Sequence, residues 1–291
     1  MVLCYGLFRG TLFQGEVVRL LKIVSLVFVA ILGFAGCSNH KAKADEGSLA
    51  SIKERGVLRV GVFSDKPPFG YMDAKGQFQG FDVYIARRMA KDLLGDSKKI
   101  QFIPVEAAAR VEFLKANKVD VIMANFTKTK ERAEVVDFAK PYMKVALGVV
   151  SKDGVIKSIE DLKGKPLIVN KGTTADFYFS KYYPEISLLK YDQNTETFLA
   201  LKDNRAPALA HDNTLLFAWV KKNPEFKVGI PSLGDQDVIA PAVKRGHKEL
   251  LEWLNDEIDK LTKEGFMKQA YDATLKPIYG NDIDPSMVIF Q

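Results

Sequence analysis

The chain has 291 residues, a length that favours two domains, and 47% hydrophobic, 27% charged and 11% aromatic residues, as in an ordinary globular protein. The net charge is +6 without a basic block, which gives no support for nucleic-acid binding. Two cysteines, Cys4 and Cys37, exclude a disulfide scaffold, and three scattered histidines do not suggest a metal cluster, so we expect neither a metal nor a cofactor.

The first 36 residues are interpreted as a secretory signal peptide. Residues 23–36 form an uncharged apolar run that follows Arg19 and Lys22. The run is shorter than the about 20 residues that span a bilayer, and small residues end it, as in a signal peptide. The alternative is a buried core helix. Because residues 1–17 are long for the charged start of a signal peptide, a start at Val17 or Val18 is a further hypothesis.

The end of this run, Phe34-Ala35-Gly36-Cys37, resembles a bacterial lipobox, in which the cysteine is lipidated and becomes the mature N-terminus. Phe34 departs from the usual leucine. Residues 37–48 are polar and small, as expected of a lipidated tether. We therefore expect a protein anchored to the membrane through Cys37, in the periplasm or at the cell surface, with no free thiol after processing.

Strand and helix patterns alternate along the first half of the remaining chain. A helix is marked by Phe81, Ile85, Met89 and Leu93, four residues apart, and ends at Gly95. The other predicted elements are a strand at 57–63, a loop at 64–70, a strand at 100–105, a helix at 107–118, a strand at 119–125 and a short helix from Thr129 to Glu134.

The second half continues the alternation and closes with helices. Strands are predicted at 146–150, 167–170, 208–211 and 238–243, and helices at 173–182, 215–222, 248–262 and from Gly265 to about 275, with a capping box at 158–161. Two α/β blocks, at about 50–145 and 150–236, predict two lobes with mostly parallel sheets. The C-terminal part is expected to return to the first lobe.

Polar side chains follow several of these strands, at the edge where open α/β sheets bind ligands. Arg132 offers a planar fork for a carboxylate, and Asp212 offers a carboxylate for an ammonium group. Thr173 and Thr174 stand at the start of a predicted helix, where their backbone N–H groups favour an anion. This inventory suits an amino-acid zwitterion. The candidate residues are Phe63, Lys66, Asn125, Thr127, Arg132, Thr173, Thr174, His211 and Asp212.

Each of these residues also has a structural explanation that remains open. Arg132 could be a surface arginine, and Asp212 and the two threonines could be plain helix caps. His211 and Phe63 could be core residues, and Lys66 is of a type that is usually solvated.

Short motifs lie in order along residues 50–278, at 56–62, 67–70, 80–83, 118–122, 127–132, 136–138, 141–142, 159–164, 171–174 and 211–212. Together they resemble the family 3 solute-binding proteins, which are the receptors of polar amino-acid ABC importers. At 124–127, 170–176 and 191–198 the chain is also similar to the cysteine-binding lipoproteins of this family.

The resemblance implies an α/β protein with the two-lobed periplasmic-binding-protein fold of type II, in which two hinge strands join the lobes. Lobe 1 would comprise residues 49–145 and 240–291, and lobe 2 would comprise residues 146–239. Such a protein binds a free amino acid by hinge closure, delivers it to an inner-membrane ABC permease and works as a monomer.

The resemblance also implies roles for single residues. Arg132 matches the arginine that binds the ligand carboxylate, Thr174 a second carboxylate donor, and Asp212 the aspartate that binds the α-ammonium group. Thr127 and Asn125 lie where the family holds the same ligand backbone. Arg110 matches a position that faces the ligand in glutamate-type members.

Two departures from the family pattern bear on the ligand side chain. Lys66 stands where several members place a stacking aromatic, and Phe63 stands where some have aspartate. Both speak against a large basic ligand. Cysteine is favoured, followed by glutamate, aspartate and other polar amino acids.

Two rival functions remain. A cyclohexadienyl or arogenate dehydratase on the same fold would need a general acid, for which Glu106 or His211 would serve. A sensory or adhesin role at the cell surface is the other alternative.

Overall fold

The computed structural model describes residues 46–291. The predicted signal peptide at 1–36 and the lipidation site Cys37 lie outside the described residues, as does most of the tether. Within the described part, no helix has the length and apolar character needed to cross a bilayer.

The first lobe is built on a five-stranded sheet in the order β5-β1-β6-β13-β7. Strand β1 is parallel to β5 and β6, whereas β13 is antiparallel to β6 and β7. The strands are β1 (Leu58–Val62), β5 (Ile100–Pro104), β6 (Val121–Ile122), β7 (Val136–Phe138) and β13 (Ala242–Lys244). A small sheet of β2 (Asp65–Lys66), β3 (Gly70–Met72) and β4 (Phe78–Gln79) belongs to the same part of the chain.

The second lobe is built on another five-stranded sheet, in the order β10-β9-β11-β8-β12. Strands β10, β9 and β11 are parallel, and β8 is antiparallel to both β11 and β12. The strands are β8 (Met143–Lys152), β9 (Leu167–Asn170), β10 (Leu188–Tyr191), β11 (Ala208–Asp212) and β12 (Phe226–Ile239).

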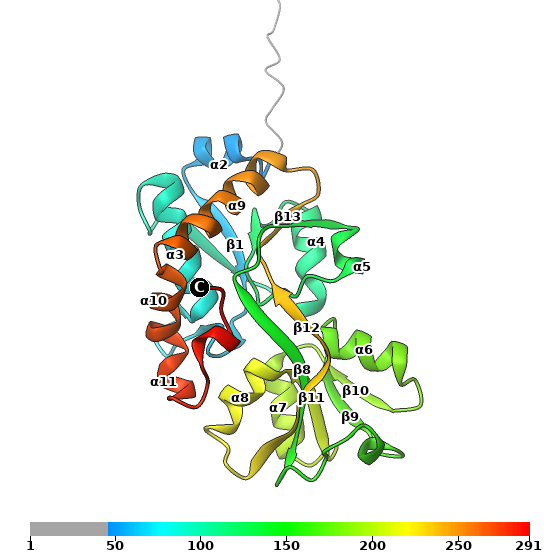
Figure 1. Cartoon of the computed structure of the whole chain (residues 1–291). Helices are drawn as coiled ribbons and strands as arrows, with labels where there is room; N and C mark the ends of the chain where they lie inside the picture. Colours follow the sequence, from blue (N-terminus) through cyan, green and yellow to red (C-terminus); the bar gives the residue numbers. More distant parts are fainter. Residues whose placement is uncertain (1–45) are drawn as a thin grey trace, which may run out of the picture. The chain divides into compact units, whose positions relative to one another are not determined.

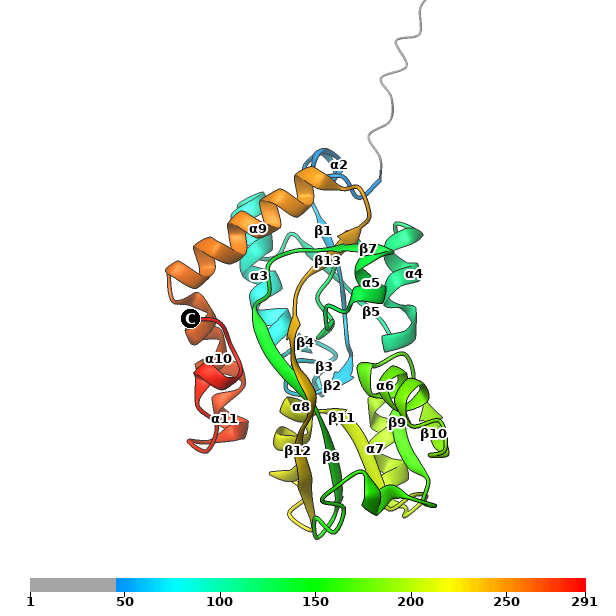
Figure 2. The same cartoon turned by 45° about the vertical axis from the view of Figure 1, so that its right-hand side comes forward.

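Strands β8 and β12 join the two lobes. They pair along most of their length and run side by side from the first lobe into the second (Figures 1 and 2). After β12 the chain enters β13 of the first sheet, so the C-terminal part returns to the first lobe as expected. The result is the predicted α/β fold of two lobes.

Helices and short 3₁₀ turns cover the sheets. Those of the first lobe are α2 (Leu49–Arg55), α3 (Phe81–Leu94), η2 (Ala107–Ala109), α4 (Arg110–Lys115), α5 (Lys130–Ala133), α9 (Lys248–Lys263), α10 (Phe266–Thr274), α11 (Lys276–Tyr279) and η4 (Pro285–Met287). Those of the second lobe are η3 (Glu160–Leu162), α6 (Thr174–Tyr182), α7 (Asn194–Lys202) and α8 (Asn213–Val220).

Local patterns predicted several helices well. On α3, Phe81, Ile85 and Met89 are buried, and the helix ends at Gly95 with φ 81°, a backbone conformation that favours glycine. On α9, Leu250 and Leu254 are buried in the same core. Burying such apolar stripes against the sheets is the main stabilisation of each lobe.

Several predictions about the strands were wrong. The two large sheets are mixed rather than mostly parallel, because β8, β12 and β13 run against their neighbours. The predicted strand at 238–243 is two strands in different lobes, separated at Ala240-Pro241. The predicted loop at 64–70 contains the short strand β2, and the 119–125 strand shrinks to Val121–Ile122.

Candidate ligand-binding site

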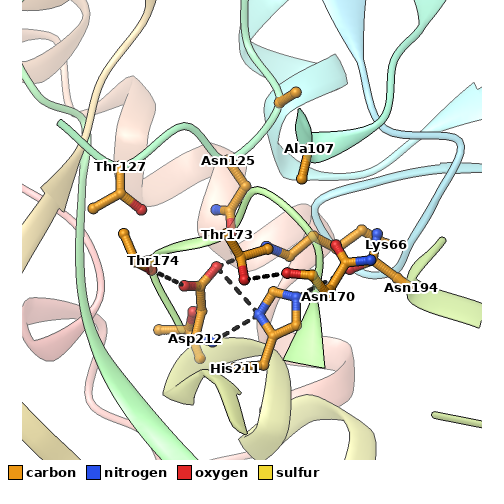
Figure 3. Close-up of polar contacts among 12 residues, drawn as sticks. Lys66, Ala107, Asn125, Thr127, Asn170, Thr173, Thr174, Asn194, His211 and Asp212 are labelled. Atoms are coloured by element: carbon orange, nitrogen blue, oxygen red, sulfur yellow. Dashed lines mark hydrogen bonds and ion pairs between the residues drawn. The ribbon is translucent and has the colours of Figure 1, made fainter. Parts of the chain in front are cut away.

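The candidate residues gather between the two lobes. Lys66 of β2 comes from the first lobe, and its Nζ lies 2.7 Å from Oδ2 of Asp212, the last residue of β11 in the second lobe. Figure 3 shows the Lys66 side chain extending to that carboxylate. Lys66 is 1% exposed, so the expectation that a lysine here is solvated is wrong. Its ammonium also lies over the rings of Phe63 and Phe69, at 5.2 and 5.9 Å.

Asp212 is buried and ionised. Burial alone would raise the pKa of its carboxyl group, but the ammonium group of Lys66 outweighs this and holds the pKa well below its usual value. Thr174 Oγ1 donates to the other carboxylate oxygen across 3.4 Å. Asp212 stands at the N-cap position of α8, yet its side chain makes no capping hydrogen bond, so capping does not explain this carboxylate.

His211 is held as a neutral imidazole. The backbone N–H of Asp212 donates to His211 Nδ1 at 2.7 Å, so Nδ1 carries no proton, and Nε2 donates to Asn194 Oδ1 at 3.1 Å. Burial and the nearby Lys66 lower the pKa of His211. Both ring nitrogens are engaged, as expected of a packed core histidine.

Arg132 reaches from α5 toward the second lobe. Its Nη1 donates to Thr127 O at 2.7 Å, and its Nη2 donates to Gly172 O at 3.0 Å. It is 7% exposed, so the surface-arginine alternative is wrong. Burial lowers its pKa to about 10.

Arg110 lies beside Arg132 and is 3% exposed. Its guanidinium donates to the carbonyl oxygens of Ala107, Ala124 and Gly172, at 2.9, 3.0 and 3.3 Å. Burial and the charge of Arg132 lower its pKa. Both guanidinium groups also stack over Phe126, at 4.3 and 4.8 Å. Two buried cations therefore meet at one carbonyl of the opposite lobe.

Asn125 follows β6 and connects this group to a buried carboxyl. Its backbone N–H donates to Asp82 Oδ2 at 2.8 Å, and the Tyr142 hydroxyl donates to Asp82 Oδ1 at 2.7 Å. Burial raises the pKa of Asp82 to about 7. Asn125 Oδ1 is buried and has no hydrogen-bond partner among residues 46–291, so it is a polar atom that a ligand donor would satisfy.

The two threonines at the start of α6 have different roles. Thr173 Oγ1 accepts from Asp176 N and donates to Asn170 O, so it is a helix cap, as one of the open explanations held. Thr174 points to Asp212 instead. Thr127 is buried and contributes its carbonyl to Arg132.

Sequence patterns missed the contacts that hold the lobes together. Asp65 accepts from the backbone N–H of Asn194 at 2.7 Å and from its side-chain amide at 2.9 Å. The carbonyl oxygen of Gly172 accepts hydrogen bonds from both Arg110 and Arg132. The sequence did place Gly172 and Asn170 beside the candidate threonines, but no local signal indicates a contact with the opposite lobe.

Two of the candidate residues, Arg132 and Thr174, line a cavity of about 1160 Å³, together with Leu147, Phe177, Tyr178 and Asp237 among others. This wall combines a guanidinium, a hydroxyl and apolar surface, which suits a small polar organic ligand. Among residues 46–291, no group of three or more His, Cys, Asp or Glu side chains is placed to hold a metal ion.

Comparisons with known proteins agree with this geometry. Residues 58–276 match the family model of the bacterial extracellular solute-binding proteins, family 3. Over 263 residues the chain is 32% identical to an ABC transporter glutamine-binding protein of Bacillus subtilis, covering 88% of this chain and 96% of the relative.

Two solved structures are more similar. A solute receptor for L-cysteine from Neisseria gonorrhoeae is 57% identical, with a TM-score of 0.83, covering 84% of this chain and 100% of that one. A cysteine-binding protein from Campylobacter jejuni is 61% identical, with a TM-score of 0.82, covering 84% of this chain and 98% of that one.

Proposed function

This chain belongs to the bacterial extracellular solute-binding proteins of family 3 and is a binding protein of an amino-acid ABC transporter, and from that premise we propose that its ligand is L-cysteine. The observation that carries the proposal is the identity of 57% and 61% to two structures described as cysteine receptors, each over 84% of this chain. Glutamate and aspartate are the second candidates, because Arg110, a second buried arginine beside Arg132, favours an anionic ligand side chain.

In this proposal the ligand is recognised through both of its charged groups. Arg132, with Thr127, Asn125 and Thr174 beside it, binds the ligand carboxylate and backbone, and Asp212 binds the ammonium group. An amino acid can be buried between the lobes only if each of its charges meets a partner. Phe63, Lys66, Arg110, Thr173 and His211 complete the surroundings of the site.

The binding step is a closure of two lobes around the ligand. Lobe 1 comprises residues 49–145 and 240–291, lobe 2 comprises 146–239, and β8 and β12 are the hinge. Closure brings Gly172 of lobe 2 onto the two arginines of lobe 1. The closed monomer then delivers its amino acid to an inner-membrane permease.

The protein is further proposed to be lipid-anchored through Cys37, after removal of residues 1–36, in the periplasm or at the cell surface. Labelled palmitate fed to cells tests this anchor. Cys37→Ala should abolish incorporation into the protein, whereas Cys4→Ala, in the segment to be removed, should not. Incorporation into Cys37→Ala would contradict the anchor.

A thermal-shift screen tests the ligand. The purified protein is refolded from denaturant to remove bound ligand and is tested under reducing conditions with the twenty amino acids, prephenate and arogenate. A ligand at about 100 times its dissociation constant adds roughly 2.7 kcal/mol of stability, which shifts Tm by roughly 5–10 °C for a chain of this size.

Such a shift is expected with cysteine. A larger shift with glutamate or aspartate would make that amino acid the ligand in place of cysteine, and the protein would still be an amino-acid-binding protein. Turnover of prephenate or arogenate without any amino-acid shift would instead establish the enzyme. Against that outcome, both nitrogens of His211 already have partners.

A further inference from the structure

The buried part of the interlobe site carries more positive than negative charge. Lys66, Arg110 and Arg132 are 1%, 3% and 7% exposed, and all three point to the same region between the lobes. Asp212 is the carboxylate in direct contact, and it pairs with Lys66 at 2.7 Å. The charges of Lys66 and Asp212 cancel each other, so the positive charges of Arg110 and Arg132 remain.

The two arginines are not neutralised by the part of the chain that the structure describes. Within residues 46–291, no carboxylate oxygen lies within 4.0 Å of either guanidinium group, and their hydrogen bonds go to carbonyl oxygens. Carbonyl dipoles orient a guanidinium without cancelling its charge. A guanidinium stays protonated at neutral pH, so two buried positive charges require a counter-charge.

The other titratable groups that face this region do not remove the excess. Asp82 of α3 has a pKa of about 7, so it supplies at most one negative charge. His211 is neutral. Asp237 of β12 faces Arg132 but is only partly buried at the cavity wall, where water screens its charge. Glu131 of α5 is exposed and pairs with Lys181. The groups counted are Lys66 on β2, Asp82 on α3, Arg110 on α4, Glu131 and Arg132 on α5, Tyr142 before β8, His211 and Asp212 on β11, and Asp237 on β12.

From this charge distribution we infer that the site binds its amino acid in a state of net charge −1, so that cysteine is held as the thiolate. A zwitterion brings one negative and one positive charge and leaves the excess unchanged. An anionic ligand side chain adds the missing negative charge. Even with Asp82 ionised, the buried groups sum to one positive charge, which such a ligand brings to zero.

The chemistry of cysteine allows this state. A free thiol has a pKa of about 8.5, and neighbouring lysine or arginine side chains favour the thiolate. On binding, the S–H bond breaks heterolytically and the proton passes to the solvent, with no oxidant or reductant involved. Lys66 and Arg110 are the residues that select the anion, whereas Arg132 and Asp212 hold the amino-acid backbone.

The inference rests on the proposed function only for the identity of the ligand. Thiolate absorbs in the ultraviolet where the thiol does not, so a difference spectrum of the purified protein saturated with cysteine at pH 7 reports the ionisation state directly. The ionisation of Asp82 does not produce this band, so it does not contribute to the thiolate signal. A thiolate band of about one equivalent per protein is expected, and bound cysteine without the band would overturn the inference while leaving the cysteine receptor intact.

The pH dependence of affinity gives a second readout. If only the thiolate binds, cysteine affinity rises about tenfold for each pH unit between pH 6 and pH 8, because one proton is released per ligand. Serine, whose hydroxyl does not ionise in this range, should bind far more weakly and without that slope. Serine binding as tight as cysteine binding would count against an anionic ligand.

Lys66→Met tests the residue assignment, with Lys91→Met on the exposed face of α3 as the matched control. Lys66→Met should reduce the thiolate band and flatten the pH slope, whereas Lys91→Met should change neither. If glutamate proves to be the ligand instead, the inference predicts that glutamate binds at least about tenfold more tightly than glutamine. A preference for glutamine would overturn both proposals.

Discussion

Gly172 of the second lobe lies against Ala108 of the first, so close that a Cβ added to Gly172 would stand 2.5 Å from the Ala108 Cα. Gly172 has φ +73°, and its carbonyl is the oxygen to which Arg110 and Arg132 both donate. This glycine thus allows the two lobes to meet at the candidate carboxylate-binding residues.

Replacing Gly172 should therefore weaken ligand binding. In Gly172→Ala the new methyl group meets backbone atoms of Ala108 that have little room to move, so the closed arrangement becomes unfavourable. Affinity for the proposed ligand, cysteine, should fall by about tenfold or more. Isothermal titration calorimetry measures this change.

Gly164→Ala is the matched control, because Gly164 has φ +71° and an added Cβ would meet no atom of the described residues within 4 Å. Both variants carry the cost of a left-handed residue, about 1–2 kcal/mol of stability. Equal losses of affinity in the two variants would show that strain, rather than the contact with Ala108, is responsible.

Arg132 and Asp212 should both be required for binding. Arg132→Met or Asp212→Asn leaves one charge of the ligand without its partner between the lobes, which costs about 2–5 kcal/mol of binding free energy. Arg245→Met, at an exposed position of the first lobe, should leave affinity unchanged. Wild-type affinity in both site variants would place the ligand elsewhere.

Asp82 should make the protein less stable as the pH rises toward neutrality. Burial raises its pKa from 3.8 to about 7 in the folded protein, so between these values the folded state binds more protons than the unfolded state. The stabilisation is complete below pH 3.8 and is lost as the pH rises through 7.

Denaturant unfolding of the wild type and of Asp82→Asn, each at pH 4 to pH 8, checks this. An asparagine does not titrate, so the stability advantage of the wild type over the variant should shrink by up to roughly 4 kcal/mol across this range. If the free energies of unfolding of the wild type and of Asp82→Asn change in parallel with pH, Asp82 titrates near its ordinary pKa.

The C-terminal helix should contribute to the stability of both lobes. The Tyr279 hydroxyl on α11 donates to Thr214 O on α8 of the second lobe, at 2.8 Å and buried. Tyr279→Phe removes that hydrogen bond and should lower the free energy of unfolding by about 0.5–1.5 kcal/mol. Tyr182→Phe, on an exposed tyrosine, should cause no comparable loss in the same denaturant titration.

The sequence by itself determined several of the helices and the positions of the candidate residues along the chain. The stripe on α3 with its end at Gly95, and the cap of α5 by Thr129, depend on residues within one or two turns of each other. Such short-range periodicity and capping chemistry can be read directly from the sequence. Family motifs added the two-lobed fold.

Only the tertiary structure decided how distant segments meet. Lys66 and Asp212 are 146 residues apart, and no local pattern near Lys66 indicates that a lysine there is buried against a carboxylate of the other lobe. The same holds for the arginines at Gly172 and for the antiparallel entry of β13 between β6 and β7. These contacts depend on the path by which the chain crosses between lobes twice, because burial and charge pairing are properties of the packed whole rather than of any segment.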